Sequence, residues 1–279
     1  MFKSKNREEF AMCRLFGLIA NKEVDIYFSM QEASKSFKVL GKIHRDGWGI
    51  GWYEKSIASI EKKGETAPES EKFVEVSREV KSKIFIAHVR LASCGNTTDK
   101  NSHPFRYVEG EKEGKEKYWI FAHNGTVDGD EIMSLLIPPY DEEFTSQPID
   151  SEIYFRFILQ CINKEGNNVE EGIKRAVQEI IDEGFANGGA NFLLSDGKNL
   201  YGFKYGNHLY YLERDPGDVF WGESTETRSL IEVKRLAEEK AVIIASEEMT
   251  SDEDWKPLKD GDLIIVTKNL QVRIENIID

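Results

Sequence analysis

Short apolar runs bounded by polar or turn-forming residues recur along the chain and predict β-strands. They cover residues 14–20, 48–53, 84–91, 118–122, 191–195, 200–205, 209–212, 241–246, 263–268 and 271–277. Apolar residues at helical spacing predict helices over residues 29–40, 150–162, 168–183 and 228–240 instead. Many strands accompanied by helices in pairs predict an α+β fold in which packed sheets are covered by helices.

Turn signals connect several of these elements. The dipeptides Asp196-Gly197 and Gly206-Asn207 lie between predicted strands and favour hairpins. No internal repeat or composition break divides the chain, so we predict one domain over residues 13–279, preceded by a tail or propeptide at residues 1–12. Polar and charged segments predict surface loops at 61–72, 92–102, 109–117 and 138–148.

Composition narrows the classes of protein. The formal net charge of -13 argues against a general nucleic-acid binder, which needs a basic surface. No apolar run approaches the roughly 18 residues of a membrane span, and the first ten residues lack the apolar core of a secretory signal. Three scattered cysteines favour neither disulfides nor a zinc cluster, so a cytoplasmic location is the default expectation.

Cys13 leads the first predicted strand and is a candidate nucleophile. A thiol attacks as its thiolate, and a free thiol has a pKa near 8.5, so a base is needed. If the working chain begins at Cys13, its own α-amine, with a pKa of about 7.7–8.0, can serve. That requires loss of residues 1–12, either because translation starts at Met12 or because they are a propeptide. The alternative is that Cys13 is a packed strand residue.

Further candidates lie at the ends of predicted strands and helices. Asn124-Gly125 follows a strand and either forms an oxyanion hole or makes a type I′ turn. Arg90 shares a polar face with His88 and either binds a carboxylate or reaches solvent. Asp150 heads a helix, where it either binds an ammonium group or interacts with the helix dipole.

Metal and nucleotide cofactors find little support in the sequence. The five histidines lack metal-ligand spacing, and no HExxH helix or CxxC pair accompanies them. Residues 47–51 contain three glycines, but the aromatic residue among them and the strand that follows do not suit phosphate binding. We therefore expect neither a metal nor a cofactor.

Taken in order, several motifs resemble those of class II glutamine amidotransferases, which are N-terminal nucleophile hydrolases. The chain is most similar to their stand-alone, YafJ-like branch and to the related γ-glutamyl hydrolases of thiol metabolism. A later segment, residues 244–250, also resembles this branch. The motifs are MCRLFG at 12–17, RDGWGIG at 45–51, AHVRLAS at 87–93, NSHPF at 101–105, HNG at 123–125 and DSE at 150–152.

The resemblance implies a four-layer α/β/β/α sandwich of two antiparallel sheets. It implies that Cys13 is the nucleophile, with its α-amine as base, and that Asn124 and Gly125 form the oxyanion hole. Arg90 would bind the substrate α-carboxylate and Asp150 its α-ammonium group. It places three further residues in the substrate-binding set: Ser93, His103 and His123.

The resemblance implies hydrolysis of glutamine or of a γ-glutamyl amide through a cysteine thioester. The chain has no room for a synthase domain, so it would release ammonia or pass it to a separate partner. A catalytically inactive γ-glutamyl-binding module is the third possibility, and a homo-oligomer is also open. One departure is the loop at 91–95, which reads LASCG where synthase-linked members usually carry WATHG.

Overall fold

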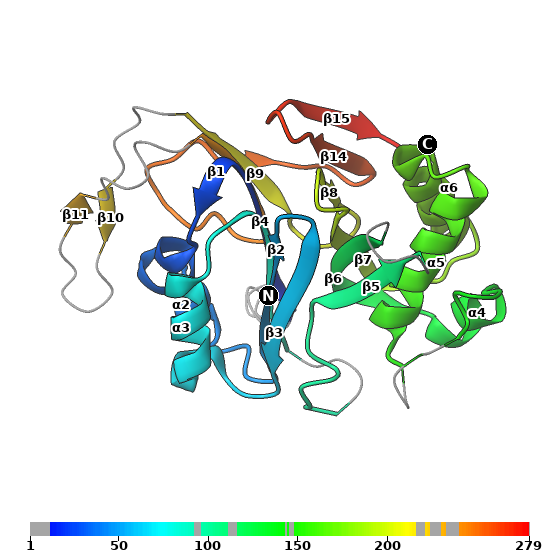
Figure 1. The fold of residues 1–279 in the computed structure, drawn as a ribbon, viewed down its shortest axis with the longest axis horizontal. Helices are drawn as coiled ribbons and strands as arrows, with labels where there is room; N and C mark the ends of the chain where they lie inside the picture. The colour runs from blue at the N-terminus through cyan, green and yellow to red at the C-terminus, as the bar shows by residue number, and fades with distance from the viewer. Residues whose placement is uncertain are drawn as a thin grey trace, which may run out of the picture.

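Two antiparallel sheets stacked face to face form the centre of the molecule, with helices on both outer faces (Figure 1). The predicted α+β sandwich of four layers is thus confirmed. The structure, a computed structural model, describes residues 12–91, 96–110, 116–142, 144, 148–215, 221–223, 230–232 and 240–278.

The first sheet carries the start of the described chain at its centre. Its seven strands lie in the order β13-β9-β12-β1-β4-β2-β3. Strand β1 (Arg14–Val24) pairs with β4 (Ser82–Val89) on one side and with β12 (Ala241–Ala245) on the other. The remaining strands are β2 (Trp48–Glu54), β3 (Ile57–Lys63), β9 (Tyr210–Arg214) and β13 (Lys256–Pro257).

The second sheet has six strands in the order β15-β14-β8-β7-β6-β5. Its two longest strands, β6 (Lys117–Val127) and β7 (Ala186–Ser195), pair over most of their length. The others are β5 (Phe105–Glu109), β8 (Leu200–Phe203), β14 (Asp262–Val266) and β15 (Val272–Asn276). A separate two-stranded ribbon joins β10 (Trp221–Glu223) to β11 (Leu230–Glu232).

Helices cover the outer face of each sheet. The first sheet is covered by the π-turn η1 (Phe28–Glu32), α2 (Phe37–Leu40), the 3₁₀ turn η2 (Ala67–Glu69) and α3 (Glu71–Glu79). The second is covered by α4 (Gly129–Ser134), α5 (Asp150–Lys164) and α6 (Val169–Asp182). None of the described helices is long and apolar enough to cross a membrane.

Residues 15–20 of strand β1 are buried on both faces, which explains their unbroken apolar sequence. Leu15 and Ile19 point between the sheets, whereas Phe16 and Leu18 point toward the outer helices. Successive strand residues face opposite sides, so a strand between two covered faces needs apolar residues at every position. The start of β1 is therefore held rigidly in the middle of the sandwich.

The helix predicted over residues 29–40 is divided in the structure. The chain leaves η1 at Ala33, and both Ser34 Oγ and Lys35 N donate hydrogen bonds to the Met249 carbonyl, at 3.0 and 3.2 Å. Ser36 then caps α2. Contacts with a segment more than 200 residues away thus override the helical spacing, and these contacts are invisible in local sequence.

The surface loop predicted over residues 61–72 is wrong at both ends. Strand β3 continues to Lys63, and α3 begins at Glu71, where the Ser70 hydroxyl accepts the Phe73 N–H at 3.3 Å. The many charged residues cover the solvent side of α3, while Phe73 is fully buried and packs edge-on against Trp48 with ring centroids 5.2 Å apart. High charge concealed an amphipathic helix.

The two predicted hairpins and the helix predicted at 228–240 have different outcomes. The Asp196-Gly197 hairpin joins β7 to β8 as expected, but Gly206-Asn207 is no hairpin, because β8 belongs to the second sheet and β9 to the first. Of the helix predicted at 228–240, residues 230–232 form β11 instead, and residues 228, 229 and 233–239 lie outside the described residues.

We predict that Phe73→Ala lowers the free energy of unfolding by about 3–5 kcal/mol, because it leaves a cavity beneath α3. Urea denaturation followed by circular dichroism measures the change. Ile57→Ala is the matched control, since Ile57 is 53% exposed, and it should change stability by less than about 0.5 kcal/mol. A loss below about 1 kcal/mol for Phe73→Ala would contradict the packing of α3.

Candidate functional site

The Cys13 thiol lies where the start of β1 meets the end of β4. Its Sγ accepts the Leu91 N–H at 3.3 Å and is 3.3 Å from the Leu91 carbonyl oxygen, to which the thiol donates. Burial raises the pKa of the Cys13 thiol to about 11, although the Leu91 contact and the positive charges of Arg90 and Arg14 oppose that rise. The thiol is therefore neutral at pH 7 and needs a base.

The segment around Cys13 is fixed by residues that follow β12. Arg14 Nε donates to Glu247 Oε1 at 2.7 Å, and Arg14 Nη1 donates to the Met12 carbonyl at 2.6 Å. Leu15 N donates to Ser246 Oγ at 3.0 Å. Glu247 and Ser246 are functional candidates that side-chain chemistry alone did not identify. The sequence feature that pointed to these two residues was the family-like segment at residues 244–250.

Arg90 is buried, and its positive charge acts on the Cys13 thiol. Its backbone N–H donates to the Gly47 carbonyl at 2.8 Å, and its own carbonyl accepts the Asp46 N–H at 3.0 Å. The turn at 45–51 therefore holds Arg90 in place. Its guanidinium donates to the Asn96 carbonyl at 3.2 Å, and Asn101 donates to the same oxygen at 3.0 Å.

Asn124 and Gly125 lie within strand β6, so a type I′ turn is excluded. They pair with Asn191 and Ala190 of β7. A Cβ atom at Gly125 would lie 1.9 Å from the Gly189 carbonyl oxygen, so only glycine fits between these strands. The ladder shifts register between Gly125 and Val127, an irregularity of the kind that re-aims backbone and side chains at sites.

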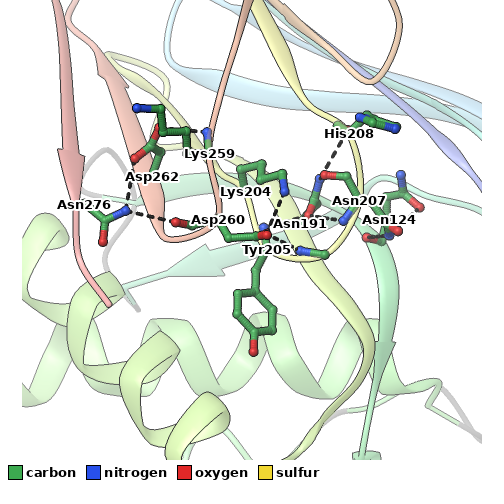
Figure 2. A network of polar contacts seen from close by, with 11 residues as sticks. Asn124, Asn191, Lys204, Tyr205, Asn207, His208, Lys259, Asp260, Asp262 and Asn276 are labelled. Carbon is green, nitrogen blue, oxygen red and sulfur yellow. Dashed lines mark hydrogen bonds and ion pairs between the residues drawn. The ribbon is translucent and has the colours of Figure 1, made fainter. Parts of the chain in front are cut away.

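A buried asparagine cluster orients Asn124 (Figure 2). Asn207 Nδ2 donates to the Asn124 carbonyl at 2.9 Å and lies 3.5 Å from Asn124 Oδ1. Asn191 Nδ2 donates to the Asn207 carbonyl at 2.9 Å, while its Oδ1 accepts the Tyr205 N–H at 2.8 Å. The crossing between the sheets at residues 204–209 is thereby tied to Asn124. Sequence reasoning missed this cluster because it read Gly206-Asn207 as a hairpin.

Asp150 begins α5, as the sequence predicted. Its Oδ2 accepts the Val127 N–H at 3.2 Å, and its Oδ1 accepts the Ser151 N–H at 2.8 Å. His123 Nδ1 lies 2.9 Å from Ser151 Oγ. Burial lowers the pKa of His123, with the Asp150 charge opposing. His123 thus faces α5, on the opposite side of β6 from its neighbour Asn124, and contacts Asp150 through Ser151.

His103 is buried between the sheets. Its ring lies tilted against the ring of His88, with centroids 4.3 Å apart, and meets Phe105 edge-on at 4.9 Å. Burial holds the pKa values of His88 and His103 well below the usual range, so both are neutral. Ser93, the remaining candidate, lies outside the described residues.

Two cavities flank these residues. The Asp150 cavity, of about 640 Å³, is lined by Asp150, Asn96 and Asn101. The Asn96 carbonyl accepts hydrogen bonds from both Arg90 and Asn101. The Asn124 cavity, of about 480 Å³, is lined by Asn124 and by both neighbours of Cys13, Met12 and Arg14. Among the described residues, no group of three or more His, Cys, Asp or Glu side chains is placed to hold a metal ion.

The chain belongs to the class-II glutamine amidotransferases, because the sequence profile of that family matches residues 12–276. An uncharacterized protein of Methanocaldococcus jannaschii is 34% identical, over 91% of this chain and 69% of that protein. The putative glutamine amidotransferase YafJ of Escherichia coli is 27% identical, over 90% of this chain and 96% of that protein.

The fold is also shared with the glutamine phosphoribosylpyrophosphate amidotransferase of B. subtilis. The TM-score is 0.62 at 17% sequence identity, over 95% of this chain. This chain spans about half the length of that enzyme, since the match covers 49% of it. The fold that the two proteins share is the sandwich of two stacked antiparallel sheets.

We predict that alkylation of Cys13 in the full-length chain is slow at pH 7 and rises about tenfold per pH unit toward a pKa of about 11. Iodoacetamide labelling followed by peptide mass spectrometry measures each cysteine separately. Cys161 serves as the internal reference, because burial raises its pKa to about 12. A plateau of Cys13 labelling below pH 9 would show that the thiol is not desolvated as described.

Proposed function

We propose that the protein is an amidohydrolase that cleaves the γ-amide of glutamine or of a γ-glutamyl compound through a thioester on Cys13. The observation that carries this proposal is that Asn124 and both neighbours of Cys13 line one cavity. The scissile carbonyl would lie at this junction, within reach of the thiol and of the strand that bears Asn124 and Gly125.

In this mechanism the Cys13 α-amine takes the thiol proton, directly or through one water, as sulfur attacks the γ-carbonyl carbon. Asn124 Nδ2 and the Gly125 N–H would stabilise the oxyanion. Arg90 and the Leu91 N–H stabilise the developing thiolate before attack. The ammonium form of the amine then protonates the leaving nitrogen, the C–N bond breaks, and water hydrolyses the thioester to the free γ-carboxylate.

The glutamyl head group would lie on the Asp150 side. Glutamate derivatives carry an α-ammonium and an α-carboxylate at fixed spacing, so one anion and one cation are needed. Asp150 supplies the anion, and Arg90, which contacts Asn96 at the same cavity, supplies the cation. His123 would act as a positioning residue that holds Ser151 and hence Asp150. His103 would support the substrate region through His88.

The base exists only if the Met12–Cys13 bond is absent, because in the intact chain the Cys13 nitrogen is an amide. We therefore predict that a chain with Cys13 at its amino terminus releases ammonia from glutamine at least about 10³-fold faster than the chain that retains residues 1–12. Expression from Met12, followed by removal of that methionine, produces the first form. Intact mass identifies each form.

Cys13→Ala in the processed form should abolish turnover, while Cys161→Ala, a core change near the end of α5, should retain it. Undiminished turnover by Cys13→Ala would refute the thioester. Full activity in a chain that verifiably keeps residues 1–12 would refute the α-amine as base. A processed chain that binds glutamine without turnover would be the γ-glutamyl-binding module, and ammonia release only with a partner present would indicate a glutaminase subunit.

We predict that Asp150→Asn removes recognition of the α-ammonium group. Losing a charge-assisted hydrogen bond costs about 1.5–3 kcal/mol, so kcat/KM for glutamine should fall by about 10- to 100-fold. The matched substrate is glutaramate, which is glutamine without its α-amine, and its kcat/KM should change little. An equal loss for both substrates would assign Asp150 a structural role through Val127 and Ser151 instead.

A further inference from the structure

The Asn124 cavity is larger than hydrolysis of glutamine requires. It lies between the start of β1, helix α2 with the turn that follows it, and the crossing at residues 204–209. Its volume is about 480 Å³. A water-sized guest such as ammonia needs only about 10–15 Å³ of such space. Pockets of this size in proteins hold small organic molecules.

The position of this cavity relative to the catalytic groups identifies which part of a substrate enters it. Asp150, the expected partner of the α-ammonium group, lines the other cavity. A substrate whose head group lies there and whose carbonyl lies at Asn124 must extend its leaving nitrogen into the Asn124 cavity. Met12 lines this cavity too, so it adjoins the nitrogen of Cys13 that would protonate the departing amine.

The lining of the cavity is largely apolar on the α2 side. Val39, Leu40 and Ile43 come from α2 and the turn after it, and Tyr210 of β9 also lines the cavity. Ile43 is 44% exposed in this structure. Exposure of an apolar side chain to water is unfavourable, and an apolar guest would reduce it. These side chains suit an aliphatic or aromatic group attached to the leaving nitrogen.

His44 is the polar feature of the same wall. It is fully buried, and neither ring nitrogen has a hydrogen-bond partner among the described residues. Burial and the charge of Arg14 lower the pKa of His44 to about 4, so the ring is neutral at pH 7. A neutral imidazole offers one donor and one acceptor, and leaving both unused in the interior is unfavourable. His44 therefore contributes no charge to this wall of the cavity.

The charges at the rim argue against a cationic guest. Glu247 Oε1 accepts from Arg14 at 2.7 Å and Glu247 Oε2 contacts Lys35 Nζ at 3.4 Å. Two cations, Arg14 and Lys35, thus lie beside the cavity with Glu247 between them. An amine that carries a second ammonium group would meet these cations and would lose hydration against the apolar wall.

We propose that the Asn124 cavity binds the leaving group of a γ-glutamyl amide, and that the substrate class is γ-glutamyl amides of bulky, predominantly apolar amines rather than glutamine. This inference rests on the proposed amidohydrolase function. Hydrolysis of such an amide returns glutamate and the free amine, with water as the co-reactant. Glutamine remains a substrate, but one that leaves most of the cavity unfilled.

The test compares three amides that share the glutamyl head: glutamine, γ-glutamyl-phenethylamide and γ-glutamyl-putrescine. Ammonia and alkylamines are leaving groups of similar reactivity, so differences report binding. We expect kcat/KM for the phenethylamide to exceed that for glutamine by at least about tenfold. The putrescine amide, of intermediate length but cationic, should fall below the phenethylamide by a similar factor. Both the full-length chain and the chain that begins at Cys13 are assayed.

A matched pair of substitutions localises the effect. Ile43→Trp narrows the cavity, so the ratio of kcat/KM for phenethylamide over glutamine should fall at least about fivefold. Val39→Trp, which alters the same wall from within α2, should lower that ratio as well. Ile57→Trp places the same ring at another exposed isoleucine, on β3 and outside the cavity, and should leave the ratio unchanged.

The outcomes separate the two proposals. Turnover of glutamine with no gain for the phenethylamide would overturn the leaving-group cavity and leave the amidohydrolase function standing. A gain for the phenethylamide that is insensitive to Ile43→Trp and Val39→Trp would likewise overturn the assignment of this cavity. Absence of turnover for all three amides in both forms of the chain would overturn the amidohydrolase function and this inference together.

Discussion

The pairing of β1 between β4 and β12 is the constraint on which the site depends. Residues 15–20 of β1 are buried on both faces and hydrogen-bonded along both edges, so a slip in register would break two ladders of hydrogen bonds and misfit the side chains packed on either face. That register brings Cys13 against Leu91 at the end of β4. It also brings Arg14 and Leu15 against the Ser246-Glu247 turn after β12. The nucleophile candidate thus lies immediately before the central strand of the first sheet.

The second sheet contributes its groups through irregular features. Gly125 lies where β6 and β7 approach too closely for any side chain. The register shift that follows lies between Gly125 and Val127, whose N–H donates to Asp150. The asparagine cluster then ties Asn124 to the chain crossing from β8 to β9. Because that crossing links the sheets, the two halves of the site are held at one relative position.

The electrostatics of the interior follow from burial. Four histidines, His44, His88, His103 and His123, have lowered pKa values because of desolvation, and all are neutral at pH 7. In the proposed mechanism, their neutrality would leave Arg90 and Asp150 to act on a bound zwitterion without competition from imidazolium groups. The same burial raises the pKa of the Cys13 thiol, which is why the proposed chemistry needs an amine at residue 13.

The sequence by itself determined the sandwich class, most strands, helices α5 and α6, and the order of the candidate residues. These depend on local apolar patterns and on motifs that are continuous in the chain. It could not determine the break at Ala33, the helix α3, the crossing at residues 204–209 or the strand setting of Asn124-Gly125. Each of these depends on a partner far away in the chain, such as Met249, Trp48 or Gly189. The presence of two cavities is likewise a property of the packed structure. Asp150 begins α5 and Asn124 lies on the neighbouring strand β6, yet they line different cavities.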